Sequence, residues 1–234
     1  MSARPDLDAL IARFGLDPPA RDKLASLLDV LACDEHAPTT VSDPARAADV
    51  HLADSLVALE LAEVRRALAV ADLGAGAGFP GLALAIALPG ARVTLVEASG
   101  RKCSFLIRLV EAVGLANVDV VSERAEAWEP GRGRCDLVTA RALGPLALIA
   151  EYAAPLLALG GTAVAWKGRR DAGEEEAAAQ AARELGLDGP RASAAVPYPG
   201  SRDRHLHRFD KVAETPARFP RRPGMARKRP LGGP

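Results

Sequence analysis

Five short apolar runs that alternate with helical stretches constrain the fold of this chain more than any other feature. The runs, at residues 68–73, 91–98, 118–122, 136–140 and 162–167, have the length and apolar content of buried strands. Stretches with helical character occupy residues 80–88, 101–113, 145–159 and 171–187. Alternation of this kind predicts right-handed βαβ units and a doubly wound, mostly parallel sheet.

The flanking segments complete the predicted architecture. Residues 194–198 and 205–212 are strand candidates that would pair antiparallel at the edge of the sheet, giving seven strands. Leucines spaced three and four apart predict one or two helices over residues 6–36, and Asp43-Pro44 predicts the start of a helix that runs to about residue 67. We therefore expect an α/β fold with an N-terminal helical cap (1–67), a ligand-binding domain (68–214) and a basic C-terminal tail (215–234) without regular structure.

Composition excludes several protein classes. The chain has 234 residues, of which 49% are hydrophobic and 26% charged, so a disordered or fibrous chain is ruled out. Apolar runs reach only about ten residues, too short to span a bilayer, and the N-terminus carries acids where a signal peptide needs an apolar core. The three cysteines are far apart, which argues against disulfides and a zinc site. We expect a cytoplasmic protein without a metal, and a monomer by default.

The net charge of zero conceals two unlike parts. Residues 201–234 contain ten Lys and Arg against three acids, a balance of +7, so the preceding residues carry −7. From Pro216 onward there are six basic residues and no acid. Such a segment fits either a polyanionic partner or a solvated chain end, and charge alone does not separate these.

A glycine-rich turn follows the first predicted strand. Gly74, Gly76, Gly78 and Gly81 lie between a strand and a helix, where glycine lets the backbone approach a ligand closely. The last three match G-x-G-x-x-G, and Glu97 lies 21 residues after Gly76, as in a dinucleotide fingerprint.

Two details favour S-adenosylmethionine (SAM) over NAD at this turn. Asp72, at the strand's end, would repel a pyrophosphate but suits a ligand with an ammonium and a sulfonium. Phe79-Pro80 stands where dinucleotide binders keep small residues. Glu97 fits either ligand, because both carry a ribose diol.

Further candidates lie elsewhere in the chain. His51 and Asp54 share a face of one predicted helix, which suits either a pocket rim or an interhelical ion pair. Arg141 and Lys167 end consecutive strands, where doubly wound sheets bind ligands, although Lys167 also fits a surface lysine.

The chain resembles the bacterial 16S rRNA guanine-N7 methyltransferases (RsmG, also called GidB). The resemblance is carried by the segment DLGAGAGFPGLALAIALPGARVTLVEASGRKCSFL and by HLADS, SERAE, VTARA, WKG and FPRRPG, in the right order along nearly the whole chain. It implies a class I SAM-dependent methyltransferase with a Rossmann-like sheet. It also implies that the partner is 16S rRNA or the small ribosomal subunit, and that the target is a guanine of the decoding region.

The same resemblance implies roles for individual residues. Gly74 and Phe79 would line the cofactor site, Glu97 would bind the ribose, Ala125 and Glu126 would bound the adenine, and Arg141 would border the methionine end. His51, Asp54 and Arg141 are the residues expected to orient guanine or cofactor as the catalytic set. The cofactor-binding set is completed by Asp72, Gly76 and Gly78.

The sequence departs from the family pattern at two places. Ala37-Pro38-Thr39 replaces the usual Asn-Leu-Thr, and Val50 replaces a basic residue often found before the histidine. If these positions touch RNA, substrate affinity or choice of site differs in this protein.

The basic residues of the tail are predicted to contact RNA, with Phe219 available to stack on an exposed base. The predicted RNA contacts are Lys167, Arg218, Arg221, Arg222, Arg227, Lys228 and Arg229. Guanine N7 carries an exposed lone pair, so no general base is expected. Three alternatives stay open: a SAM-dependent small-molecule methyltransferase, an NAD-dependent oxidoreductase and a non-enzymatic RNA-binding protein.

Overall fold

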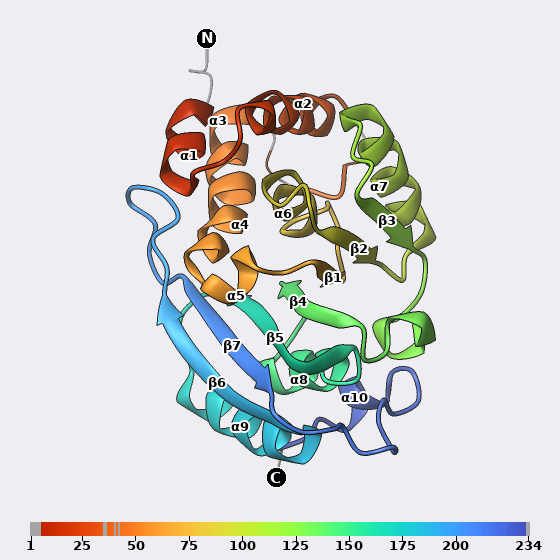
Figure 1. Ribbon diagram of the computed structural model, residues 1–234. Coiled ribbons are helices and arrows are strands. Elements are labelled where there is room, and N and C mark those ends of the chain that lie inside the picture. Colours follow the sequence, from red (N-terminus) through yellow and green to blue (C-terminus); the bar gives the residue numbers. More distant parts are fainter. Residues whose placement is uncertain (1–5, 35–36, 40, 42, 233–234) are drawn as a thin grey trace.

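Figure 1 shows the computed structural model as a central sheet with helices on both faces; it describes residues 6–34, 37–39, 41 and 43–232. The strands are β1 (Ala69–Leu73), β2 (Arg92–Val96), β3 (Val118–Val121), β4 (Cys135–Arg141), β5 (Leu157–Lys167), β6 (Leu187–Ala194) and β7 (His205–Lys211). Their order across the sheet is β3-β2-β1-β4-β5-β7-β6. The predicted doubly wound, seven-stranded α/β fold is confirmed.

The direction of the strands determines which edge of the sheet can hold a ligand. β1 to β5 are mutually parallel where they pair, and only β7 runs antiparallel, to β5 on one side and β6 on the other. Leu73, the last residue of β1, is level with Val96 of β2 and Ala140 of β4. Winding reverses between β1 and β4, and a crevice opens at the carboxyl ends of the strands at such a point.

Two hydrophobic cores, one on each face, hold the sheet. The helices α1 (Leu7–Phe14), α2 (Pro19–Cys33), α6 (Gly81–Ala87) and α7 (Gly100–Val113) contribute to the first core, and α8 (Leu146–Ala153) and α9 (Ala172–Leu185) to the second. Side chains of β1 alternate between them, because Val70 lies in the first core and Ala71 and Leu73 in the second. This alternation is the period of two that a strand imposes.

The segment predicted as one helix over residues 43–67 is instead a series of short helical pieces. They are α3 (Pro44–Ala47), the π-helix η1 (Ala48–Ala53), α4 (Asp54–Leu56), the 3₁₀-helix η2 (Val57–Glu60) and α5 (Ala62–Arg65). The predicted start is confirmed, since Asp43 Oδ1 accepts a 2.8 Å hydrogen bond from Arg46 N. The break before α5 lies at Leu61, whose backbone is extended.

Two predicted boundaries were wrong. The strand expected at residues 194–198 is β6, which ends at Ala194, and residues 195–198 form a loop. Gly189 and Pro190 are residue types that are rare inside strands, so the sequence does not indicate β6, and the pairing of β6 with β7 is irregular at this point. The helix expected over residues 145–159 ends at Ala153, because Pro155 cannot continue it, and β5 begins at Leu157.

The C-terminal tail, expected to lack regular structure, is folded onto the second core. Phe219 is buried there, and so is Ala226 of the short helix α10 (Met225–Lys228). Figure 1 shows α10 beside α8, and the two helices are in contact.

Two further 3₁₀ turns, η3 (Ala125–Ala127) and η4 (Glu129–Gly131), lie between β3 and β4. In the described part of the chain, no helix combines the length and apolar character needed to cross a membrane.

Candidate functional site: two adjoining cavities

Two cavities open at the carboxyl ends of the parallel strands. The first has a volume of about 240 Å³ and is lined by Gly74, Val96, Glu97, Ala98, Lys102, Glu123, Arg124, Ala125, Glu126, Ala142, Leu143, Tyr152 and Arg227. The second, of about 360 Å³, is lined by Val50, Asp54, Val57, Arg141, Ala142, Gly144, Trp166, Lys167, Gly168, Ala195, Arg204, His205 and Leu206. Ala142 lines both, so the loop after β4 separates them.

The glycine turn shapes the first cavity. Gly74, Gly76 and Gly78 have φ of +66°, +58° and +93°, which only glycine adopts readily. A side chain at Gly78 would also place its Cβ 2.3 Å from Leu82 Cδ1. The turn therefore keeps its backbone against α6, and Gly74 lies in the wall of the first cavity close to Leu143.

Glu97 joins the turn to the end of β2. Its carboxylate accepts hydrogen bonds from Gly76 N (3.1 Å) and Ser99 N (2.8 Å), and only 7% of the residue is exposed. A carboxylate has about four acceptor positions, so acceptor capacity remains for a diol in the cavity. The predicted ribose-binding role fits this geometry.

Asp72 does not line either cavity, which corrects the expectation of direct ligand contact. It is fully buried and accepts hydrogen bonds from Gly81 N (3.0 Å) and Thr139 Oγ1 (2.8 Å). Burial raises its pKa to about 6, although these two hydrogen bonds act in the opposite direction. Asp72 therefore fastens the start of α6 to β4.

Phe79 is also buried rather than exposed to the first cavity. His51 stacks on its ring with 4.7 Å between centroids and 10° between planes, and the Arg141 guanidinium lies 5.7 Å from the ring centroid. The expected contact of Phe79 with the cofactor is thus replaced by a contact with the two predicted catalytic residues. Phe79 positions His51 and Arg141.

The predicted trio His51, Asp54 and Arg141 is brought together. Arg141 Nη1 donates to Asp54 Oδ2 (3.1 Å) and to the Val50 carbonyl (2.9 Å). Arg141 Nη2 lies 3.5 Å from His51 Nδ1. The π-helix η1 and the first residue of α4 supply His51 and Asp54, and local π-helical geometry is frequent at functional sites. Arg141 lines the second cavity, not the first.

His51 is neutral at pH 7. Burial, and secondarily the Arg141 charge, lower its pKa to about 4. Because Arg141 is a donor at Nδ1, the proton belongs on Nε2, which lies 3.0 Å from Thr39 Oγ1. Thr39, which matches the family pattern although Ala37 and Pro38 before it do not, thus fixes the His51 ring.

The C-terminal segment closes the first cavity, which sequence reasoning missed. Glu126, buried as part of the cavity wall, accepts a 2.9 Å hydrogen bond from Gly224 N. Arg227, predicted as an RNA contact, lines this cavity and donates to the Leu143 carbonyl (3.3 Å). Tyr152 of α8 completes the wall, and no sequence pattern marked it.

The predicted RNA-binding residues divide into two groups. Four of them have partners within the protein: Lys167 pairs with Glu174, Arg218 with Glu184, Arg221 with Glu151, and Arg227 with the Leu143 carbonyl. Arg222, Lys228 and Arg229 are exposed, and no ion pair joins them to other described residues.

Phe219 was expected to be free for stacking on a base. It is 7% exposed and its ring is covered by the Arg218 guanidinium 5.0 Å away, so this expectation was wrong.

Across the residues that the structure describes, no cluster of three or more His, Cys, Asp and Glu side chains could hold a metal ion.

Comparisons with known proteins agree with this arrangement. A family model described as GidB, rRNA small subunit methyltransferase G, matches residues 23–195. A curated protein from Rubrobacter xylanophilus is 44% identical, over 78% of this chain and 72% of its own length. One from Synechococcus sp. (strain JA-3-3Ab) is 34% identical, over 99% and 95% respectively. Both are named "Ribosomal RNA small subunit methyltransferase G".

Solved structures share the fold. The SAM-dependent methyltransferase SibL superposes with a TM-score of 0.58 at 16% identity, covering 84% of this chain and 70% of that one. A predicted O-methyltransferase from Agrobacterium tumefaciens gives 0.53 at 24% identity, covering 70% and 81%.

Proposed function

We propose that this chain, which belongs to the GidB family of rRNA small subunit methyltransferases G, transfers a methyl group from SAM to N7 of a guanine in 16S rRNA. Family membership rests on the match over residues 23–195 and on relatives up to 44% identical among those compared. The observation that supports the reaction best is the pair of cavities that meet at Ala142. Donor and acceptor need such adjoining sites.

The first cavity would hold the cofactor. Glu97 would accept hydrogen bonds from the ribose diol, and Ala125 and Glu126 would bound the adenine ring. The methionine end would lie along Gly74 and the loop after β4, both of which line this cavity. SAM supplies an electrophilic methyl group on a positively charged sulfur.

The transfer requires no proton movement. The lone pair of guanine N7 forms a bond to the methyl carbon while the carbon–sulfur bond breaks and its electron pair stays on sulfur. The product is S-adenosylhomocysteine. His51 is neutral and hydrogen-bonded at Nδ1 by an arginine, so it orients Arg141 rather than exchanging a proton. Positioning of this kind supplies roughly 7–11 kcal/mol of a reaction barrier.

The RNA would contact the protein around the second cavity and at the exposed basic residues of the C-terminal segment. Arg222, Lys228 and Arg229 are available for phosphate contacts, and Lys167 lies at the cavity itself. The target guanine must be turned out of its stack to reach a cavity at the strand ends. The substrate, 16S rRNA or the small subunit, would place this enzyme in the cytoplasm.

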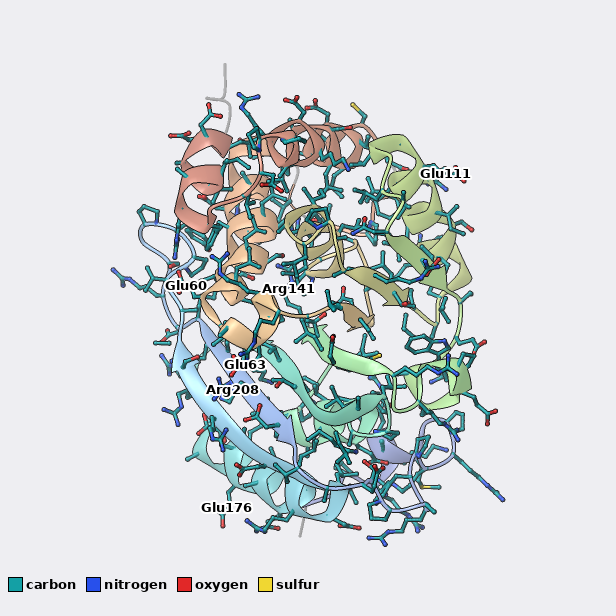
Figure 2. The ribbon with its side chains drawn as sticks, viewed as in Figure 1. Glu60, Glu63, Glu111, Arg141, Glu176 and Arg208 are labelled. Atoms are coloured by element: carbon teal, nitrogen blue, oxygen red, sulfur yellow. The ribbon has the colours of Figure 1, made fainter. Side chains whose placement is uncertain are left out.

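The test is transfer of tritiated methyl from SAM to small ribosomal subunits, and separately to naked 16S rRNA, from cells that lack this enzyme. We expect label in one of these, located as 7-methylguanine by chemical cleavage of the RNA. Glu97→Ala should lose transfer, and Glu111→Gln, on the outer side of α7 in Figure 2, should keep it. Label in neither RNA, with SAM bound, would exclude the proposed substrate and favour a small-molecule acceptor.

A further inference from the structure

The second cavity is an open pocket with polar groups that the cofactor does not need. Its walls come from η1 and α4, the ends of β4 and β5, and the start of β7. Trp166 gives it a large aromatic side chain, while Asp54, Arg141, Arg204 and Lys167 give it charges. At about 360 Å³ it falls within the size range of small-ligand pockets. We propose that this cavity receives the target base, and that Asp54 and Arg204 select guanine against adenine there.

The proposal rests on the proposed function, since it locates the acceptor of that reaction. The loop from Arg141 to Gly144 is the wall between the cavities. Ala142 at its centre has φ of +55°, a conformation that costs energy for any residue with a Cβ. Gly144 continues the loop with φ of +159°, and a Cβ there would meet Leu148 Cδ2 at 2.7 Å. The surroundings thus hold the wall in a shape that a relaxed chain would not adopt.

Asp54 is the acceptor on the cavity wall. It is only 8% exposed, and Arg141 holds one of its oxygens at 3.1 Å. Its backbone carbonyl accepts a 2.7 Å hydrogen bond from Trp166 Nε1, which joins α4 to the end of β5. A buried carboxylate with one oxygen directed to a single arginine keeps acceptor capacity for two further N–H groups.

Arg204 is the donor beside it. Its Nε lies 3.6 Å from Asp54 Oδ1, and its side chain lines the cavity and is 40% exposed. A guanidinium carries five N–H donors in a planar fork, so donors remain for an acceptor in the cavity beside the Asp54 carboxylate. Sequence reasoning did not select Arg204, because it lies in the loop before β7, outside any motif.

A donor next to an acceptor matches the Watson–Crick edge of guanine. That edge presents the O6 acceptor followed by the N1–H and N2–H donors, so Arg204 would donate to O6 and Asp54 would accept from N1 and N2. Adenine presents the opposite order, a donor at N6 and an acceptor at N1, and would face like groups at both positions. Reading this edge leaves N7, on the other edge of the base, free to face the methyl group.

Saturation-transfer NMR on the full-length protein with bound S-adenosylhomocysteine tests the site. We expect guanosine monophosphate to receive magnetisation, inosine monophosphate, which lacks N2, to receive less, and adenosine monophosphate to receive least. Asp54→Asn and Arg204→Met should remove the preference. Equal signals from the guanosine and adenosine nucleotides, or no signal from the guanosine nucleotide, would overturn the proposal.

Methyl transfer to small ribosomal subunits gives a second readout. Asp54→Asn should lower kcat/KM about 10- to 100-fold, as expected for lost hydrogen bonds to a charged group, with S-adenosylhomocysteine affinity within about twofold of wild type. Glu63→Gln is the matched control. Glu63 pairs with Arg208 at 3.1 Å, and both are labelled in Figure 2. Neither residue lines either cavity. Unchanged kcat/KM in Asp54→Asn, with an active wild type, refutes the inference and leaves the proposed function intact. An inactive wild type contradicts the proposed function instead.

Discussion

Replacing Asp72 by asparagine is expected to stabilise the ligand-free protein at neutral pH and to weaken its discrimination in favour of SAM. Asp72 is fully buried, and burial raises its pKa from 3.8 to about 6. At pH 7 the carboxylate is ionised, and the two hydrogen bonds that it accepts come from neutral donors, Gly81 N and Thr139 Oγ1. Asparagine has nearly the same shape, can accept from Gly81 N and can donate to the threonine oxygen.

The magnitude follows from the pKa difference. Between pH 3.8 and about 6 the folded protein keeps a proton on Asp72 that the unfolded chain loses, so stability falls as pH rises through this window. A rise in the pKa of Asp72 from 3.8 to about 6 means that its buried charge lowers the free energy of unfolding by about 3 kcal/mol, and this cost is fully present above pH 6. The advantage of Asp72→Asn should therefore grow from near zero below pH 4 to about 3 kcal/mol at pH 7.

Urea denaturation of both proteins across this pH range measures the stability difference. Asp119→Asn, which removes an exposed acid paired with Arg92, is the control and should show no such growth. Calorimetric titration should show a weaker preference for SAM over S-adenosylhomocysteine in Asp72→Asn, because only SAM carries the sulfonium charge. A variant less stable than wild type at pH 7, or an advantage independent of pH, would refute the assigned cost of the buried carboxylate.

Three further perturbations probe other parts of the site. Glu97→Ala should weaken S-adenosylhomocysteine binding about 10- to 100-fold in calorimetry, because a charged acceptor for the ribose is lost; an unchanged Kd contradicts the cofactor assignment. His51→Gln should remove most of the pH dependence of the free energy of unfolding between pH 6.5 and about 4. In the wild type the His51 pKa is lowered to about 4, so in this window the unfolded chain binds a proton that the folded protein does not. Wild-type stability therefore falls by about 3 kcal/mol as the pH drops through the window. Denaturation at pH 4 and 7 checks this, and an equal pH slope in both proteins argues against it. Arg221→Met should cost about 3–5 kcal/mol in urea denaturation, because Glu151, 2% exposed, keeps a buried charge without its partner; the double variant with Glu151→Gln should recover most of the loss, and failure to recover would point to packing instead.

The C-terminal segment changes how an RNA-binding role should be tested. Deleting residues 216–234 would separate an rRNA enzyme from a small-molecule enzyme only if the segment were unstructured. In the structure this segment contributes Phe219 to the second core and Arg227 to the lining of the first cavity, and Gly224 N donates a hydrogen bond to Glu126 in that lining. Deletion would therefore remove part of the wall of the first cavity in either case. Neutralising Arg222, Lys228 and Arg229 together separates the two without removing a wall of the site.

Local patterns predicted those features that depend on neighbouring residues. The apolar runs of β1 to β5 are short and bounded by turn residues, and the glycines of the turn at Gly74–Gly78 have the positive φ that their residue type allows. The Asp43 cap was visible because its chemistry is confined to one helical turn. By contrast, β6 was misplaced because Gly189-Pro190 interrupts its strand character, which only pairing with β7 restores.

The sequence by itself determined the sheet and the glycine turn, and it selected four residues that line the first cavity, namely Gly74, Glu97, Ala125 and Glu126. These follow from periodicity, backbone freedom and the resemblance of motifs. Tertiary structure alone decided that Asp72 is buried, that Phe79 lies against His51 and Arg141, and that the C-terminal segment closes the first cavity. It also placed Arg204 beside Asp54, 150 positions earlier in the chain. The reason is physical: burial, stacking and charge pairing depend on distances between residues far apart in sequence, and no local pattern encodes those distances.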